Sequence, residues 1–92
     1  MINPKMYKLI IKVDCPFCKK AVNLLTQNKI PFIVVAADKG DQFLQEQKSN
    51  YNWPTVPIVI AIDENNNETV IGGFTELNER ISRNTGRILL ND

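Results

Sequence analysis

The order of elements along the chain predicts an α/β domain with a four-stranded mixed sheet flanked by three helices, in the order βαβ-α-ββα. Short runs of β-favouring residues alternate with segments of helical periodicity, and a polar turn separates the last two runs. A strand–helix–strand opening is expected to form a right-handed parallel unit. The closing pair is expected to be an antiparallel hairpin, so the sheet is mixed. The order of the strands within the sheet does not follow from the sequence.

The first half of the chain predicts two strands and the helix that joins them. Apolar and more polar residues alternate over residues 6–12, which is typical of a strand. A helix is expected over residues 16–28, because Pro16 suits the first helical position and apolar residues recur at helical spacing. Residues 32–36 form a continuous apolar run and are expected to be a strand covered on both faces.

The second half predicts the remaining two helices and a hairpin. A helix over residues 41–49 is followed by a buried strand over residues 57–62. The polar stretch at residues 63–68 is expected to turn into a short strand over residues 69–71. A last helix is expected over residues 75–84, with Gly86 as its stop signal. Residues 88–90 are expected to pack back on the domain.

Composition limits the class of protein. The 92 residues are expected to form a single domain over residues 1–92, and 43% hydrophobic and 23% charged residues are ordinary for a globular protein. The net charge of +1 and the absence of long charge runs argue against nucleic-acid binding, and no apolar run is long enough to span a membrane. No hydrophobic stretch typical of a signal peptide begins the chain, so a cytoplasmic location is expected. Thiols are kept reduced there.

Two cysteines lie where the first strand meets the first helix, in the sequence Cys15-Pro16-Phe17-Cys18. A cysteine at a helix N-terminus faces unpaired backbone N–H groups and the positive end of the helix dipole, and both favour the nucleophilic thiolate. Lys12, Lys19 and Lys20 favour it further, whereas Asp14 opposes them. Cys18, one turn inside the helix, is expected to be less exposed and suited to resolving a mixed disulfide.

Other uses of a cysteine pair fit this chain less well. A structural zinc site normally needs four ligands, and the chain has two cysteines and no histidine. A metal or iron–sulfur site shared between two chains stays open. A structural disulfide of this spacing would close a very small loop and stabilise little. Redox chemistry is therefore the preferred interpretation.

Three motifs in this order resemble the glutaredoxin family. Cys15-Pro16-Phe17-Cys18 is similar to the family's CPYC, Thr55-Val56-Pro57 matches its TVP, and Gly72-Gly73-Phe74 matches the GG step before its last helix. The resemblance covers nearly the whole chain and implies a thioredoxin fold with a cis proline at Pro57. It also implies a glutathione-dependent thiol–disulfide oxidoreductase with Cys15 and Cys18 as its catalytic residues.

The resemblance implies a glutathione site as well. Val56 would offer its backbone N–H and C=O to the cysteine of glutathione, in the manner of strand addition. The N–H groups that follow Gly72 and Gly73 suit the glutamyl carboxylate, since a helix N-terminus attracts anions. A pair of glycines that makes only a turn is the alternative. The full set implied by the resemblance is Lys12, Phe17, Thr55, Val56, Pro57, Gly72, Gly73, Phe74 and Thr75.

Two residues depart from the family pattern. Many glutaredoxins carry an aspartate just after the GG step, where this chain has Thr75, which can cap the helix, and Glu76, which is a candidate substitute. Many also carry a basic or amide residue before TVP, where this chain has Trp53 and Pro54. Trp53 either flanks the groove or is a half-buried loop aromatic.

The resemblance implies glutathione as reducing co-substrate, no metal, and a monomer. Its partners would be disulfide-containing or glutathionylated proteins, with ribonucleotide reductase one candidate by analogy with relatives. Two alternatives remain. One is a redoxin reduced by thioredoxin reductase, although the chain lacks the WCGPC motif of thioredoxins. The other is a dimeric metal- or cluster-binding module, against which Pro16 argues. The sequence does not give the reduction potential or the protein substrate.

Overall fold

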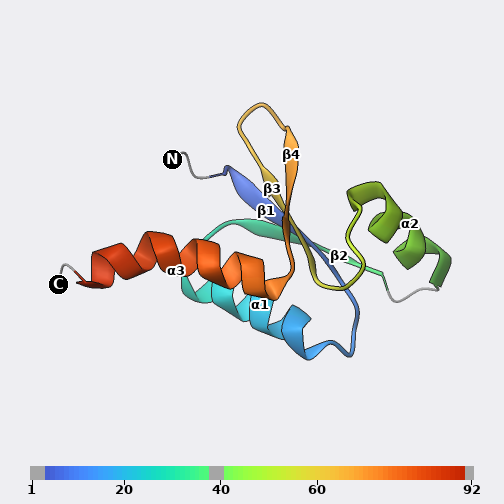
Figure 1. The fold of residues 1–92 in the computed structure, drawn as a ribbon, viewed down its shortest axis with the longest axis horizontal. Coiled ribbons are helices and arrows are strands. Elements are labelled where there is room, and N and C mark those ends of the chain that lie inside the picture. The colour runs from blue at the N-terminus through green and yellow to red at the C-terminus, as the bar shows by residue number, and fades with distance from the viewer. Residues whose placement is uncertain (1–3, 38–40, 91–92) are drawn as a thin grey trace.

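The computed structural model describes residues 4–37 and 41–90, and it leaves the side chains of Asp41 and residues 84–90 undescribed. Within these ranges the chain forms the predicted order of elements (Figure 1). They are β1 (Met6–Ile11), α1 (Pro16–Gln27), β2 (Phe32–Ala36), α2 (Asp41–Tyr51), β3 (Ile58–Ile62), β4 (Glu68–Gly72) and α3 (Phe74–Leu90). None of the described helices has the length and apolar character needed to cross a membrane.

The four strands form one mixed sheet in the order β2-β1-β3-β4. β1 and β2 are parallel, whereas β3 is antiparallel to both β1 and β4. This arrangement confirms the predicted parallel opening unit and the closing hairpin, and it supplies the strand order. The architecture is that of the thioredoxin fold, as the motifs implied.

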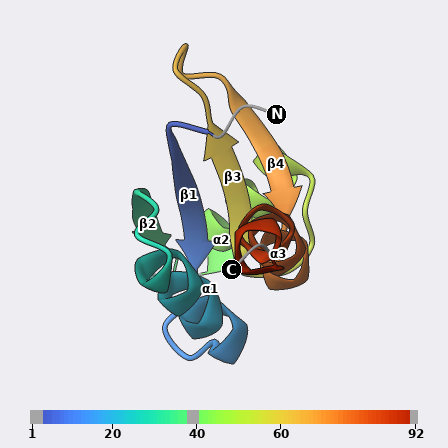
Figure 2. The same cartoon turned by 90° about the vertical axis from the view of Figure 1, so that its left-hand side faces the viewer.

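Helices cover both faces of the sheet. α1 and α3 pack against each other on one face, and α2 lies apart from them on the other (Figures 1 and 2). Because successive strand residues point to opposite faces, β1 sends Leu9 to one side and Ile10 to the other. Leu9 joins the cluster that contains Leu25 of α1 and Leu77 of α3, and Ile10 joins the cluster that contains Leu44 of α2.

The central strands carry most of the core. All five residues of β3 are buried, as predicted for this run, because β3 lies between two strands and under helices on both faces. β2 differs from the prediction of a strand covered on both faces: Ile33 and Val34 are 44% and 43% exposed. β2 is an edge strand, so its continuous apolar run does not indicate full burial.

The last helix is longer than predicted. α3 runs from Phe74 to Leu90, so the helix continues through Gly86 instead of ending there. A glycine inside a helix costs only about 1 kcal/mol relative to alanine, and it ends a helix only where the chain turns away. The expected packing of residues 88–90 lies outside the described side chains.

Three chain segments meet at one end of the sheet. β1 ends there before α1, β3 starts there, and β4 ends there before α3 (Figure 2). The sheet therefore brings together the cysteine motif, the Thr55–Pro57 loop and the glycine pair, which lie far apart in the sequence.

Candidate active site

Cys15 is the N-cap residue of α1. Its backbone is extended (φ −137°, ψ 104°), Pro16 follows at the first helical position, and the sulfur accepts the backbone N–H of Cys18 at 3.1 Å. The structure shows the Cys15–Cys18 disulfide, with the two Cα atoms 5.1 Å apart. In the reduced protein the same N–H and the helix dipole would stabilise a thiolate on Cys15. The local geometry thus favours Cys15 as nucleophile.

The two cysteines differ in exposure in the predicted direction. Cys15 is 8% exposed and Cys18 1%. An external disulfide can therefore approach Cys15 more readily, whereas Cys18 is suited to attack a sulfur already attached to Cys15. No group of three or more metal-ligating side chains is found within the described ranges.

Three basic residues lie close to the cysteine motif along the chain. Lys12, Lys19 and Lys20 are all exposed, and none of them forms an ion pair with another described residue. Lys20 places its Nζ 5.0 Å from the ring centroid of Phe17, within the range of a cation–π contact. Asp14 is also exposed, so it reduces the positive charge of this surface without removing it.

The loop before β3 lies against the dithiol. The Val56–Pro57 peptide bond is cis, as the TVP motif implied. The Val56 carbonyl oxygen lies 4.0 Å from Cys15 Sγ, while Thr55 is exposed and Pro57 is buried. An extended segment that carries a cysteine to Cys15 would therefore meet the backbone of Val56, which is the geometry needed for strand addition.

The glycine pair shapes the start of α3. Gly72 has φ +135°, which side-chain-bearing residues rarely adopt. Gly73 directly precedes the helix: its carbonyl accepts the Leu77 N–H at 3.1 Å, and its own N–H donates to Glu76 Oε1 at 2.8 Å. The predicted cap at Thr75 was wrong, because the helix begins one residue earlier and Glu76 caps it from inside.

Glu76 is a site residue whose role the motif did not define. A glutamate three residues after the N-cap commonly reaches back to the N-cap N–H, so the spacing from Gly73 to Glu76 was the available signal. The N–H groups left for a ligand in the first turn are then those of Phe74, Thr75 and Glu76, since the first four N–H groups of a helix have no intrahelical partner and that of Gly73 bonds to the Glu76 side chain.

Aromatic residues border both helix starts. The rings of Phe17 and Phe74 lie 6.0 Å apart, and Phe17 is 53% exposed. Trp53 is half-buried, with Nε1 3.7 Å from the position that a Gly73 Cβ would occupy. That Nε1 is buried and has no hydrogen-bond partner among the described residues. Trp53 therefore belongs to the wall of the site beside the glycine turn.

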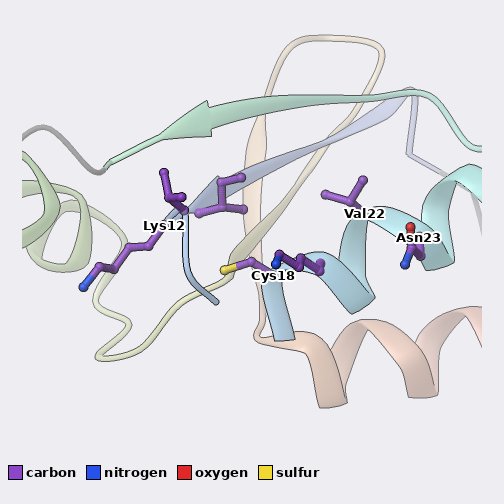
Figure 3. A pocket seen from close by; sticks show the side chains of 7 residues that line it. Lys12, Cys18, Val22 and Asn23 are labelled. Atoms are coloured by element: carbon purple, nitrogen blue, oxygen red, sulfur yellow. The ribbon is translucent and has the colours of Figure 1, made fainter. Parts of the chain in front are cut away.

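A pocket of about 300 Å³ opens on the other side of the dithiol (Figure 3). Lys12 and Cys18 line it together with three further residues of α1, namely Lys19, Val22 and Asn23, of which the last two were not indicated by the sequence. Their spacing places these three on one face of the helix, but that pattern alone does not identify the strand end that completes the pocket.

Comparison with known proteins agrees with this geometry. The sequence model of the family described as Glutaredoxin matches residues 7–65, which is more than half of the chain and includes the cysteine motif and the Thr55–Pro57 loop. A search of curated proteins found no match. The chain therefore belongs to the glutaredoxin family, whose members are thiol–disulfide oxidoreductases.

Proposed function

We propose that this protein is a glutathione-dependent oxidoreductase that reduces protein disulfides and glutathione mixed disulfides in the cytoplasm. The observation that carries the proposal is the position of Cys15 at the N-terminus of α1, where the Cys18 N–H donates to its sulfur and the Val56 carbonyl lies 4.0 Å away. The Cys18 N–H favours a thiolate on Cys15, and the Val56 carbonyl is a backbone acceptor for the substrate that the thiolate attacks.

The reaction with a glutathionylated protein needs only one cysteine. The Cys15 thiolate attacks the glutathione sulfur, forming a Cys15–glutathione disulfide, and the substrate protein leaves as a thiolate that takes a proton from water. A second glutathione thiolate then attacks the glutathione sulfur of this adduct. Cys15 is released as a thiolate and glutathione disulfide is formed, so each turnover consumes one free glutathione, and the other half of the glutathione disulfide comes from the substrate.

The reaction with a protein disulfide uses both cysteines. Attack by Cys15 breaks the substrate's S–S bond and leaves a mixed disulfide with one substrate thiolate released. The Cys18 thiolate then attacks Cys15 Sγ, which releases the second substrate thiol and forms the Cys15–Cys18 disulfide seen in the structure. Two molecules of glutathione restore the dithiol. The 1% exposure of Cys18 suits this intramolecular step.

Four features support glutathione as the reductant. The Val56 backbone is placed to pair with its cysteine, and the N–H groups of Phe74 and Thr75 at the start of α3 suit its glutamyl carboxylate. Glu76, held by the Gly73 N–H, provides an acceptor for the neighbouring ammonium group. Lys12, three residues before Cys15, is a candidate partner for the glycyl carboxylate.

Identifying the molecule that reduces the protein tests this proposal. We would follow NADPH consumption with a small mixed disulfide and two separate reducing systems, glutathione with glutathione reductase and thioredoxin reductase alone. Turnover with the first system and none with the second is expected. The reverse result would make the protein a redoxin served by thioredoxin reductase. Turnover with neither, together with bound metal in a dimer, would indicate the metal-binding module instead.

A further inference from the structure

The pocket beside Cys18 is formed by two segments of the chain, and the proposed glutathione site does not combine them. Ile11, Lys12 and Val13 come from the end of β1 and the residues after it, and Lys19, Val22 and Asn23 come from one face of α1. Cys18 lies between them (Figure 3). None of the lining residues comes from the Val56–Pro57 loop or from the glycine turn, so the pocket borders the dithiol on a separate side.

The lining combines an aliphatic interior with positive charge. Ile11 and Val22 are partly buried and pack against the core cluster beneath them, whereas Lys12 and Lys19 are exposed. No carboxylate lines the pocket, and neither lysine forms an ion pair with another described residue. A volume of about 300 Å³ accommodates an amino-acid side chain together with part of its neighbours. The complementary ligand has an apolar body and a negatively charged end.

The location of the pocket indicates where such a ligand would come from. The sulfurs of Cys15 and Cys18 are close enough to form a disulfide, so a substrate sulfur bonded to Cys15 of the reduced protein lies within a few residues of chain from the pocket. A substrate segment that pairs with Val56 on one side of its cysteine can place the residues on the other side of that cysteine between Lys12 and Lys19.

We propose that this pocket selects protein substrates whose reactive cysteine is flanked by acidic and aliphatic residues. The aliphatic side chain would lie against Ile11 and Val22, and the carboxylate would be attracted by Lys12 and Lys19. The inference rests on the proposed function, because it concerns protein substrates of the same dithiol, but it does not depend on glutathione as reductant.

Two matched peptide disulfides test the proposal. Each has the same length and a leucine beside the cysteine, and glutamates in one are replaced by glutamines in the other. Protein reduced beforehand with dithiothreitol and freed of it is mixed with each peptide in a single turnover, and the released peptide thiol is measured. We expect the acidic peptide to react about 3–10 times faster at low salt, with the ratio falling toward one as salt screens the lysines.

Charge-reversal variants locate the effect. Lys19→Glu is expected to remove or invert the preference, while Lys29→Glu, with the same change of charge at an exposed position outside the pocket, retains it. The ratio of the two peptide rates is the readout, because a general change in cysteine reactivity cancels in it. Equal rates for both peptides in the unmodified protein, or the same ratio in both variants, would overturn the proposal. Loss of glutathione-dependent turnover with the ratio intact would overturn the proposed function alone.

Discussion

Replacing Gly72 by alanine should destabilise the protein strongly. The backbone at Gly72 has φ +135°, where a side-chain-bearing residue costs about 1–3 kcal/mol. An added Cβ would also lie 2.7 Å from Cγ and 2.9 Å from both Cβ and Cδ of Glu76, which is closer than real contacts allow. Glu76 would have to swing away and lose its hydrogen bond to the Gly73 N–H, at a cost of about 1–2 kcal/mol.

The two effects together lower the free energy of unfolding by about 2–5 kcal/mol, a large share of the about 5–15 kcal/mol typical of a domain. Urea denaturation followed by circular dichroism measures this directly, with linear extrapolation to water. In a Glu76→Ala background the obstructing Cγ and Cδ are absent, although the Cβ at 2.9 Å remains, and the hydrogen bond is already lost. The same Gly72→Ala change should then cost about 1 kcal/mol less, which a double-mutant cycle detects.

Gly73→Ala is the matched control. Its added Cβ would meet Glu76 Oε1, the Pro57 carbonyl oxygen and Trp53 Nε1 at 3.5, 3.6 and 3.7 Å, which are ordinary contact distances. The expected loss is about 1 kcal/mol or less, mainly because alanine is a poorer N-cap residue than glycine. Equal losses at the two glycines, or a Gly72→Ala loss below about 1 kcal/mol, would refute the reasoning.

Three further predictions follow from single contacts. In a Cys18→Ser variant, the rate of Cys15 alkylation by iodoacetamide should reach half its maximum at a pH at least about one unit below 8.5, the pKa of free cysteine. The reason is that the N-terminus of α1 stabilises the thiolate. A midpoint at or above about pH 8.5 would contradict this. Burial lowers the pKa of Lys8, but its hydrogen bonds to Glu68 and Tyr51 have the larger combined effect and raise this pKa above 10.5. The hydrogen bond from Lys8 lowers the pKa of Glu68 below 4.5. The ion pair therefore stabilises the folded protein at pH values between these two pKa values. Lys8→Met should lower the free energy of unfolding by at most about 1 kcal/mol at pH 7, as measured by urea denaturation. This cost should shrink as the pH falls through the lowered pKa of Glu68, and a cost that grows there would contradict the assignment. Leu25→Ala should lose about 2–4 kcal/mol in the same assay, because Leu25 is fully buried between α1 and the sheet, and a loss below about 1 kcal/mol would contradict that packing.

Local signals in the sequence were sufficient for the order of elements. β2 occupies Phe32–Ala36 as predicted, because a β-favouring run between a helix stop and a polar segment has clear limits. Its exposure was mispredicted because burial depends on the strand order, and no local pattern states which strand lies at the edge. α3 was predicted too short because a glycine marks a helix end only when the following chain departs from the helix axis.

In the candidate active site, too, some features were predictable from local sequence and others were not. The motifs located the dithiol, the loop at Val56 and the glycine turn, since each is a short sequence with its own geometry. The capping role of Glu76 was missed because Thr75 was expected to cap the helix, whereas the cap residue is Gly73, two positions earlier. The pocket between the end of β1 and α1 was missed because its two walls come together only through helix packing on the sheet.

The central claim is that Cys15 is the nucleophile and that Cys18 acts only after it. The most direct test is turnover of a small glutathione mixed disulfide with NADPH, glutathione and glutathione reductase, comparing the unmodified protein with Cys15→Ser and Cys18→Ser. We expect Cys15→Ser to abolish turnover and Cys18→Ser to retain it, because glutathione itself can resolve the Cys15–glutathione adduct. Turnover that survives Cys15→Ser, or is lost only with Cys18→Ser, would contradict the account.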